Sequence, residues 1–161
     1  MTTDTLHRIP TRLDVDAAVP TFSKAMSHLD TSATRELDRV DFPAGLRDLV
    51  RLRASQLNGC AYCVDMHGRD LRAAGETPER LDGLAAWDES PYFSEREKAA
   101  LAWAESVTNI ATTRAPDRVY EEMRGHFSEA DATHLTMGIA LMNALNRVAI
   151  AMRRGPVVKK A

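Results

Sequence analysis

Residues 48–75 read DLVRLRASQLNGCAYCVDMHGRDLRAAG, and this stretch holds both cysteines of the 161-residue chain. Apolar residues recur every three or four positions before Asn58-Gly59 and again after it, which is the period of a helix. Asn-Gly is typical of the position where a helix ends. The stretch therefore predicts two consecutive helices, of which the second begins at the cysteines and closes at Ala74-Gly75.

Cys60, Cys63 and His67 form the pattern C-x-x-C-x-x-x-H in the second of these helices. Positions i, i+3 and i+7 share one face of a helix, so the two sulfurs and the imidazole would point into the same space. Backbone N–H groups and the helix dipole favour a thiolate at a helix N-terminus. The pattern therefore predicts a reactive dithiol with a base beside it.

The two cysteines can divide the work of such a site. His67 lies one turn beyond Cys63 and could take the proton of that thiol, which favours Cys63 as the activated sulfur. In thioredoxin-type motifs the first cysteine is instead the exposed, attacking one. We therefore expect Cys63, buried beside His67, to meet an oxidant. We expect Cys60, at an exposed helix start, to resolve the oxidised sulfur and to meet the reductant.

Length and composition narrow the class of protein. A chain of 161 residues can bury a core without help from a disulfide or a metal. Its formal charge of −2 excludes the cationic surface that nucleic acid needs. No apolar run approaches the roughly twenty residues of a spanning helix, and the N-terminus lacks the apolar core of a signal peptide. We expect a cytoplasmic protein without cofactor, nucleic-acid or membrane partner, in which a C-x-x-C pair is catalytic or metal-binding.

The segment before this stretch also contains a helical pattern. Apolar residues from Val19 to Leu29 are spaced by three and four, which predicts an amphipathic helix. Pro20 suits the first turn of that helix, because its missing N–H has no partner there in any case. Residues 31–42 predict a weaker helix or a loop.

The second half of the chain predicts further helices and no strand. Ser94 and Ser128 each open a capping-box pattern, and the helix after Ser128 is expected to be the longest. No segment alternates with period two. We predict one all-α domain of about seven helices over residues 1–161, with an N-terminal arm at residues 1–14 and a C-terminal tail at residues 155–161.

Residues 51–76, RLRASQLNGCAYCVDMHGRDLRAAGE, resemble the core motif of the alkylhydroperoxidase D (AhpD-like) branch of the carboxymuconolactone decarboxylase superfamily. The resemblance implies an all-helical fold that associates into trimers or hexamers, and a peroxidase site with a proton relay. It implies that Cys63 is the peroxidatic cysteine and Cys60 the resolving one. It also implies that His67 is the relay histidine and that Asp48 stands at the position of a relay glutamate.

Two departures from the family pattern affect the relay. Asp48 is one methylene shorter than a glutamate, so its carboxylate reaches about 1.5 Å less far. Tyr62 stands where the best-known peroxidase members have a second histidine, and a phenol with a reference pKa near 10 is a poorer relay at neutral pH. We therefore expect slower peroxidase turnover than in those members.

The cysteine pair and the resemblance predict a peroxidase that reduces organic hydroperoxides through the dithiol and is itself reduced by an external thiol. Two alternatives stay open. Cys60, Cys63 and His67 could hold zinc in an interaction module, with His126, His134 or an acid as the fourth ligand. A cofactorless decarboxylase or isomerase on the same fold is the other alternative.

Several of these side chains also have ordinary structural roles. Asp48 lies among Arg47, Arg51 and Arg53 and could form a surface or subunit ion pair. Tyr62 could be a packing residue with a hydrogen-bonded hydroxyl. The pattern alone does not choose between these roles and a part in the relay.

The apolar helices predict self-association. Alanine- and methionine-rich helices in a chain of this length offer more apolar surface than one small core needs, which predicts a homo-oligomer. Asn143, Asn146 and Arg147, on the longest predicted helix, could cap helices or lie at an interface between subunits.

Overall fold

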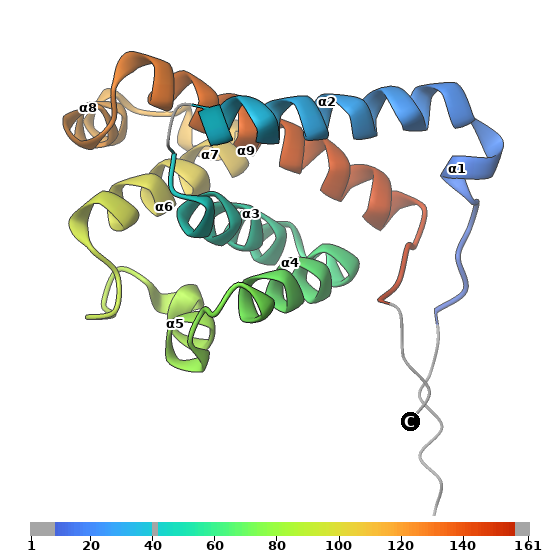
Figure 1. Ribbon diagram of the computed structural model, residues 1–161, viewed down its shortest axis with the longest axis horizontal. Coiled ribbons are helices and arrows are strands. Elements are labelled where there is room, and N and C mark those ends of the chain that lie inside the picture. The colour runs from blue at the N-terminus through green and yellow to red at the C-terminus, as the bar shows by residue number, and fades with distance from the viewer. Residues whose placement is uncertain (1–8, 40–41, 157–161) are drawn as a thin grey trace, which may run out of the picture.

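The computed structural model describes residues 9–39 and 42–156, with residues 37–39 described by their backbone alone. These residues form nine α-helices and one 3-10 helix, and contain no strand (Figure 1). The helices are α1 (Val15–Ala18), α2 (Pro20–Arg39), α3 (Ala44–Asn58), α4 (Ala61–Ala73), α5 (Pro78–Gly83), η1 (Leu84–Ala86), α6 (Glu95–Thr108), α7 (Ile110–Thr113), α8 (Asp117–His126) and α9 (Glu129–Ala151). The all-α prediction is confirmed. Two of the nine, α1 and α7, are single turns of four residues, and the other seven are the helices that the sequence predicts.

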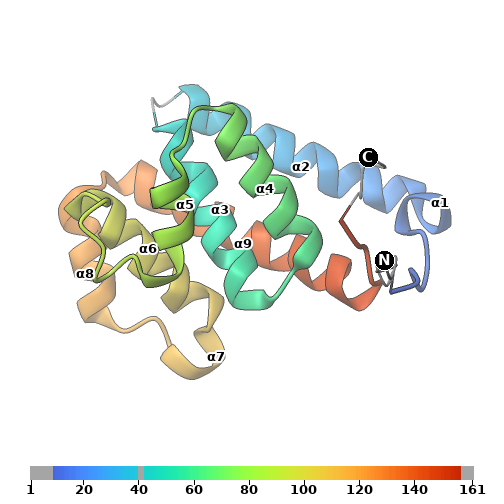
Figure 2. The same cartoon turned by 90° about the horizontal axis from the view of Figure 1, so that it is seen from below.

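α3 is the central helix and packs against α4, α6 and α9 (Figures 1 and 2). Its apolar stripe joins one continuous core, in which Leu49 of α3 and Leu101 of α6 are fully buried. Burial of a leucine side chain contributes about 1.5–3 kcal/mol, so this face fixes the position of α3. The end of α3 and the start of α4 are held with it.

Gly59 separates α3 from α4, at the break that the sequence predicts. Its φ of 71° lies in the left-handed region, and its N–H bonds the Gln56 carbonyl at 3.1 Å. Glycine adopts this conformation without the steric cost that a Cβ brings. The chain therefore turns within one residue and restarts as a helix at Cys60.

The capping patterns of the second half differ in detail. Ser94 and Glu97 form a reciprocal capping box at the start of α6. Glu97 also accepts a hydrogen bond from Arg80 at 2.6 Å, which connects α6 to α5. At the start of α9, Ser128 accepts from the Asp131 N–H at 3.1 Å. α9 is the longest of the described helices, as expected.

α2 is longer than the predicted helix. It starts at Pro20, as predicted, but continues as one helix to Arg39 instead of weakening after Asp30. Its apolar stripe faces outward: Val19, Phe22 and Leu29 are 48%, 64% and 52% exposed. The spacing of the stripe predicts that these residues share a face, but not whether another helix covers it.

The segment before α1 lies against the C-terminal end of α9. The predicted arm is described from residue 9 onward, and there the Arg12 N–H bonds the Met152 carbonyl at 3.0 Å. The rest of the arm, residues 1–8, lies outside the described residues, as do residues 157–161 of the predicted tail. Within the described part of the chain, no helix is long and apolar enough to cross a membrane.

Candidate functional site

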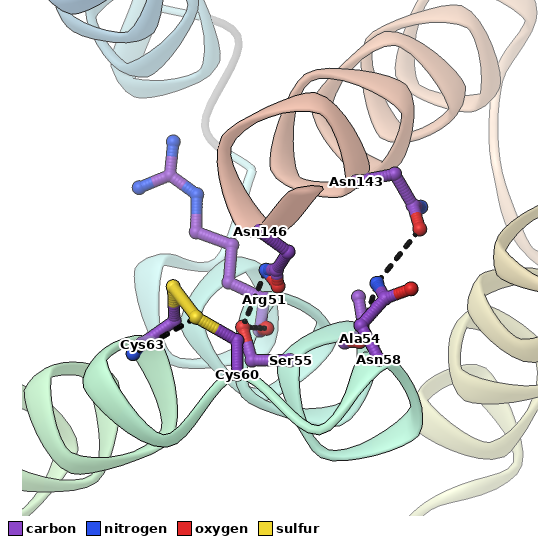
Figure 3. The surroundings of a disulfide bond; sticks show 8 residues. All are labelled: Arg51, Ala54, Ser55, Asn58, Cys60, Cys63, Asn143 and Asn146. Atoms are coloured by element: carbon purple, nitrogen blue, oxygen red, sulfur yellow. Dashed lines mark hydrogen bonds between the residues drawn. A yellow bond between two sulfur atoms is a disulfide. The ribbon is translucent and has the colours of Figure 1, made fainter. Parts of the chain in front are cut away.

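Cys60 and Cys63 form a disulfide at the start of α4 (Figure 3). Cys60 is the N-cap residue of this helix, and its Sγ accepts a hydrogen bond from the Cys63 N–H at 3.3 Å. The Cys60 N–H in turn bonds the Ser55 carbonyl at 3.0 Å, which anchors the turn to α3. The predicted place of the pair, at a helix N-terminus, is where the structure has it.

The two sulfurs differ in surroundings, and here one expectation is wrong. Cys60 is not exposed: its residue is 1% accessible and packs with Ala149 of α9 and with Tyr62. Cys63 is 4% accessible but lines a pocket of about 360 Å³, and Cys60 does not line it. The physical reason is that Ala149 of α9 and the Tyr62 side chain cover the N-cap residue of α4, which a sequence pattern cannot show.

The pocket beside Cys63 lies between α2, α4 and α9. Its volume is within the range of small-molecule sites. Aliphatic and thioether side chains form most of its wall, among them Met26, Met66, Met142, Leu145, Val148 and Met152. Asp16 and Arg154 at its rim form an ion pair at 3.9 Å. The site therefore offers an apolar molecule a place next to one sulfur.

His67 lies on α4 one turn after Cys63 and is 5% exposed. Its Nε2 atom is buried and has no hydrogen-bond partner among the described residues. Burial lowers the pKa of His67 below its ordinary value of 6.5, and the positive charge of Arg51 lowers it further, while Asp48, Asp70 and Asp30 oppose the shift. The imidazole is therefore neutral at pH 7 and can accept a proton.

Asp48 lies on α3 and pairs with arginines of the same helix. Its Oδ1 atom is 3.2 Å from Arg47 Nε and 3.7 Å from Arg51 Nη1. Arg51 also donates to Asp30 and Thr34 of α2, at 3.1 and 3.0 Å. These contacts are those of the ion-pair role that the sequence leaves open. The carboxylate acts on His67 through its charge, and a part for Asp48 in proton transfer stays a prediction.

Tyr62 is half-buried, and its described contacts are made by the ring. The Arg154 guanidinium lies over this ring, 4.5 Å from its centre. Tyr62 also lines the pocket and packs against the cysteine pair. These contacts are those of a packing residue, and a relay role for its hydroxyl stays a prediction.

Known proteins resemble this chain in sequence and in structure. The family model described as "Carboxymuconolactone decarboxylase family" matches residues 10–106, which is more than half of the chain. This chain belongs to the carboxymuconolactone decarboxylase family. The uncharacterized protein YdfG of Bacillus subtilis is 44% identical over 106 residues, a match that covers 66% of this chain and 72% of YdfG. YnjA of Escherichia coli, also uncharacterized, is 31% identical over 107 residues, covering 66% of this chain and 58% of YnjA.

Solved structures of similar proteins agree with this family. A crystal structure from Agrobacterium tumefaciens, of the protein ATU0492, superposes with a TM-score of 0.85 at 35% identity and covers 93% of this chain and all of that one. ATU0492 is described as a "Protein of Unknown Function" and as a "Putative Antioxidant Defence Protein AhpD". A peroxidase-related protein from Silicibacter sp. TM1040, at 21% identity and a TM-score of 0.71, shares the fold. Within the carboxymuconolactone decarboxylase family, this chain belongs to the AhpD-like branch.

Asn143 and Asn146 of α9 are buried. The sequence leaves open whether these amides cap helices or lie at an interface between subunits. Asn143 accepts a hydrogen bond from Asn58 at 2.8 Å (Figure 3) and donates to Thr108 of α6 at 3.1 Å. Asn146 donates to Ser55 at 3.1 Å, and its Oδ1 is buried without a partner among the described residues. Both amides hold α9 against α3 in this family member. Arg147, the third of the group, is exposed.

The metal alternative has no ligand set in the described part of the chain. No group of three or more His, Cys, Asp or Glu side chains there is arranged to hold an ion. His126 is exposed at the end of α8. His134 lies on α9, in a small space beside Arg47 and Arg51, and does not line the pocket at Cys63. Neither histidine is placed as the fourth ligand that a closed zinc site needs.

Proposed function

We propose that this protein is a thiol-dependent peroxidase that reduces organic hydroperoxides through a dithiol/disulfide cycle of Cys60 and Cys63. The observation that carries the proposal is the disulfide, of which one sulfur borders an apolar pocket. The family's decarboxylase name describes a chemistry that needs no such pair. The AhpD description of ATU0492 supports the same proposal.

The first half of the cycle consumes the peroxide. The Cys63 thiolate attacks the terminal oxygen of R–O–O–H, and the O–O bond breaks. The alkoxide leaves, takes a proton and departs as the alcohol R–OH, while Cys63 becomes a sulfenic acid. The Cys60 thiolate then attacks the Cys63 sulfur and forms the disulfide, and hydroxide leaves and is protonated to water. The peroxide has then gained the two electrons that the two cysteines have lost.

In this proposal, His67 accepts and returns the proton that the reaction with peroxide requires. Its neutral imidazole can accept the proton of the Cys63 thiol and return it to the leaving alkoxide. Its place one turn along α4 and its lowered pKa both support that role. Asp48 would act through its negative charge, which favours the imidazolium that forms in between.

The test is turnover of cumene hydroperoxide with dithiothreitol as reductant, followed as cumyl alcohol by chromatography. We expect Cys63→Ser to reduce turnover to the uncatalysed rate. Without dithiothreitol, Cys60→Ser that has been reduced beforehand should consume about one equivalent of peroxide and then stop, with a sulfenic acid on Cys63 that dimedone traps. A Cys63→Ser variant that keeps turning over would sink the proposal.

Histidine variants provide the matched control. We expect His67→Gln to lower kcat/KM by about 10²–10⁴-fold, the usual contribution of a positioned acid or base. His126→Gln, at an exposed position away from the pocket, should leave kcat/KM unchanged. Equal effects of the two substitutions would argue against His67 as the base.

A further inference from the structure

Access to the disulfide is one-sided. Cys63 lines the pocket, whereas Cys60 is 1% exposed and is covered by Ala149 and Tyr62. Thiol–disulfide exchange requires the incoming sulfur to contact the sulfur that it attacks. The reductant therefore reaches Cys63 from the pocket and meets no opening at Cys60.

The leaving sulfur is well placed for this direction of attack. Cys60 is the N-cap of the thirteen-residue helix α4, and its Sγ already accepts the Cys63 N–H at 3.3 Å. A helix N-terminus stabilises a thiolate, and a stabilised thiolate leaves faster. Attack on Cys63 thus expels the cysteine that the fold prepares to carry the negative charge.

The pocket also limits the shape of the reductant. At about 30 Å³ of liquid volume per water molecule, its volume of about 360 Å³ holds about a dozen water-sized groups. Methionine, leucine and valine are seven of its sixteen lining residues, with flexible thioethers on α2, α4 and α9, while Ser23, Ser27, Asp30 and Thr31 make the α2 side partly polar. A thiol on a slender, mainly apolar chain fits such a space. A cysteine on the rigid surface of a folded domain does not.

We propose that a small thiol enters the pocket and reduces the disulfide by attacking Cys63, so that peroxide and reductant use one entrance and one sulfur in turn. The inference rests on the proposed function for its peroxide half. It departs from the expectation that Cys60 faces the reductant.

The reduction step balances with two equivalents of thiol. The first thiolate R–S⁻ forms a bond to Cys63 Sγ as the Cys60–Cys63 bond breaks, and Cys60 leaves as a thiolate and takes up a proton. The second thiolate attacks the R sulfur of this mixed disulfide. R–S–S–R forms, the Cys63 thiolate is released, and the two electrons given up by the thiols have reduced the protein.

Single-cysteine variants test which sulfur is reachable, without any peroxide. Reduced Cys60→Ser and Cys63→Ser proteins are mixed with 2,2′-dithiodipyridine, and the release of thiopyridone is followed by absorbance. Reactivity of a thiol depends on its exposure as well as its pKa, so we expect Cys63 to react about 100-fold faster than Cys60 until the protein is denatured. A Cys60 that reacts as fast as Cys63 would overturn the inference.

Pocket-filling variants of the otherwise unaltered protein test the route. We expect Met66→Trp and Met26→Trp, on two different walls, each to slow reduction of the disulfide by dithiothreitol about tenfold or more, because the indole occupies the path. Met137→Trp is the matched control, since Met137 is 61% exposed on α9 and does not line the pocket. Circular dichroism shows whether each variant is folded.

A final experiment compares the rates at which a small and a large reductant reduce the disulfide. At equal thiol concentration, dithiothreitol should reduce the disulfide faster than thioredoxin, which presents its cysteine on a folded surface. Faster reduction by thioredoxin, or full reactivity to dithiothreitol in both Met66→Trp and Met26→Trp, would reject the shared entrance. Peroxidase activity enters none of these measurements, so their failure is distinguishable from failure of the proposed function.

Discussion

His67 and Arg51 show how single residues set the chemistry of this site. His67 is buried on α4, and Arg51 ties α3 to Asp30 and Thr34 of α2. The guanidinium is second only to burial as a cause of the lowered His67 pKa. One arginine thus has two effects: it holds α2 in place and keeps the neighbouring imidazole neutral.

A pH profile tests this coupling. Only neutral His67 accepts a proton, so kcat/KM for peroxide falls as pH drops through its pKa. Because that pKa is below 6.5, we expect the acidic limb below pH 6.5. Arg51→Gln removes a charge that lowers the pKa, while Asp48, Asp70 and Asp30 continue to raise it, so the limb should move to higher pH.

Arg53→Gln is the matched variant for this profile. Arg53 lies on the same helix but pairs with Glu105 at 2.7 Å, and its charge is not among those that shift the pKa of His67. Its acidic limb should coincide with that of the unaltered protein. An NMR titration of the His67 ring reports the pKa directly, and an unmoved pKa in Arg51→Gln would contradict the coupling.

At the scale of elements, the turn between α3 and α4 determines where the disulfide lies. Gly59 has a φ of 71°, and no atom lies within 4 Å of the place where its Cβ would be. A side chain at position 59 would therefore meet no steric obstacle from neighbouring residues. Its free-energy cost would come from the left-handed backbone conformation alone. The same turn places the Cys60 N–H on the Ser55 carbonyl.

We therefore expect Gly59→Ala to lower the free energy of unfolding by about 1–2 kcal/mol, the cost of a left-handed conformation for a residue with a Cβ. The measurement is urea unfolding followed by circular dichroism. Gly138→Ala, within α9, also meets no atom but has helical backbone, so it should raise stability by about 0.5–1 kcal/mol. If both substitutions changed the free energy of unfolding in the same direction, the conformational explanation would be refuted.

In the whole molecule, several large hydrophobic side chains of the N-terminal segment, of α2 and of α9 are exposed. The exposed large hydrophobic residues of the arm, of α2 and its start, and of the end of α9 are Ile9, Leu13, Val19, Phe22, Leu29 and Ile150. Exposed apolar patches mark sites of association. The homo-oligomer stays a prediction, and these exposed residues are candidates for its contacts.

We expect sedimentation equilibrium to give a multiple of 17.8 kDa for the unaltered chain. Phe22→Asp and Leu29→Asp, each placing a charge among these exposed residues, should shift the population toward the monomer, because an unpaired charge is costly to bury. Ile110→Asp, at an exposed apolar position on α7 away from α2, should leave the mass unchanged (Figure 2). A monomer in the unaltered protein would remove the oligomer prediction.

Much of the site follows from local sequence. Asn58-Gly59 predicts the end of α3, and C-x-x-C-x-x-x-H predicts the cysteine pair and His67 on α4, because helix ends and helical spacing depend on neighbours in the chain. The capping box at Ser94 is confirmed for the same reason.

The all-α class, the helix boundaries around Gly59 and the positions of Cys60, Cys63 and His67 on or next to α4 therefore follow from the residue pattern. The burial of Cys60, the pocket beside Cys63 and the exposure of Val19, Phe22 and Leu29 follow from helix packing. These outcomes depend on how α9 packs against α2, α3 and α4, which joins residues some ninety positions apart, such as Ser55 of α3 and Asn146 of α9. A helical period predicts which residues share a face of a helix, but only the packing of the helices determines what that face contacts.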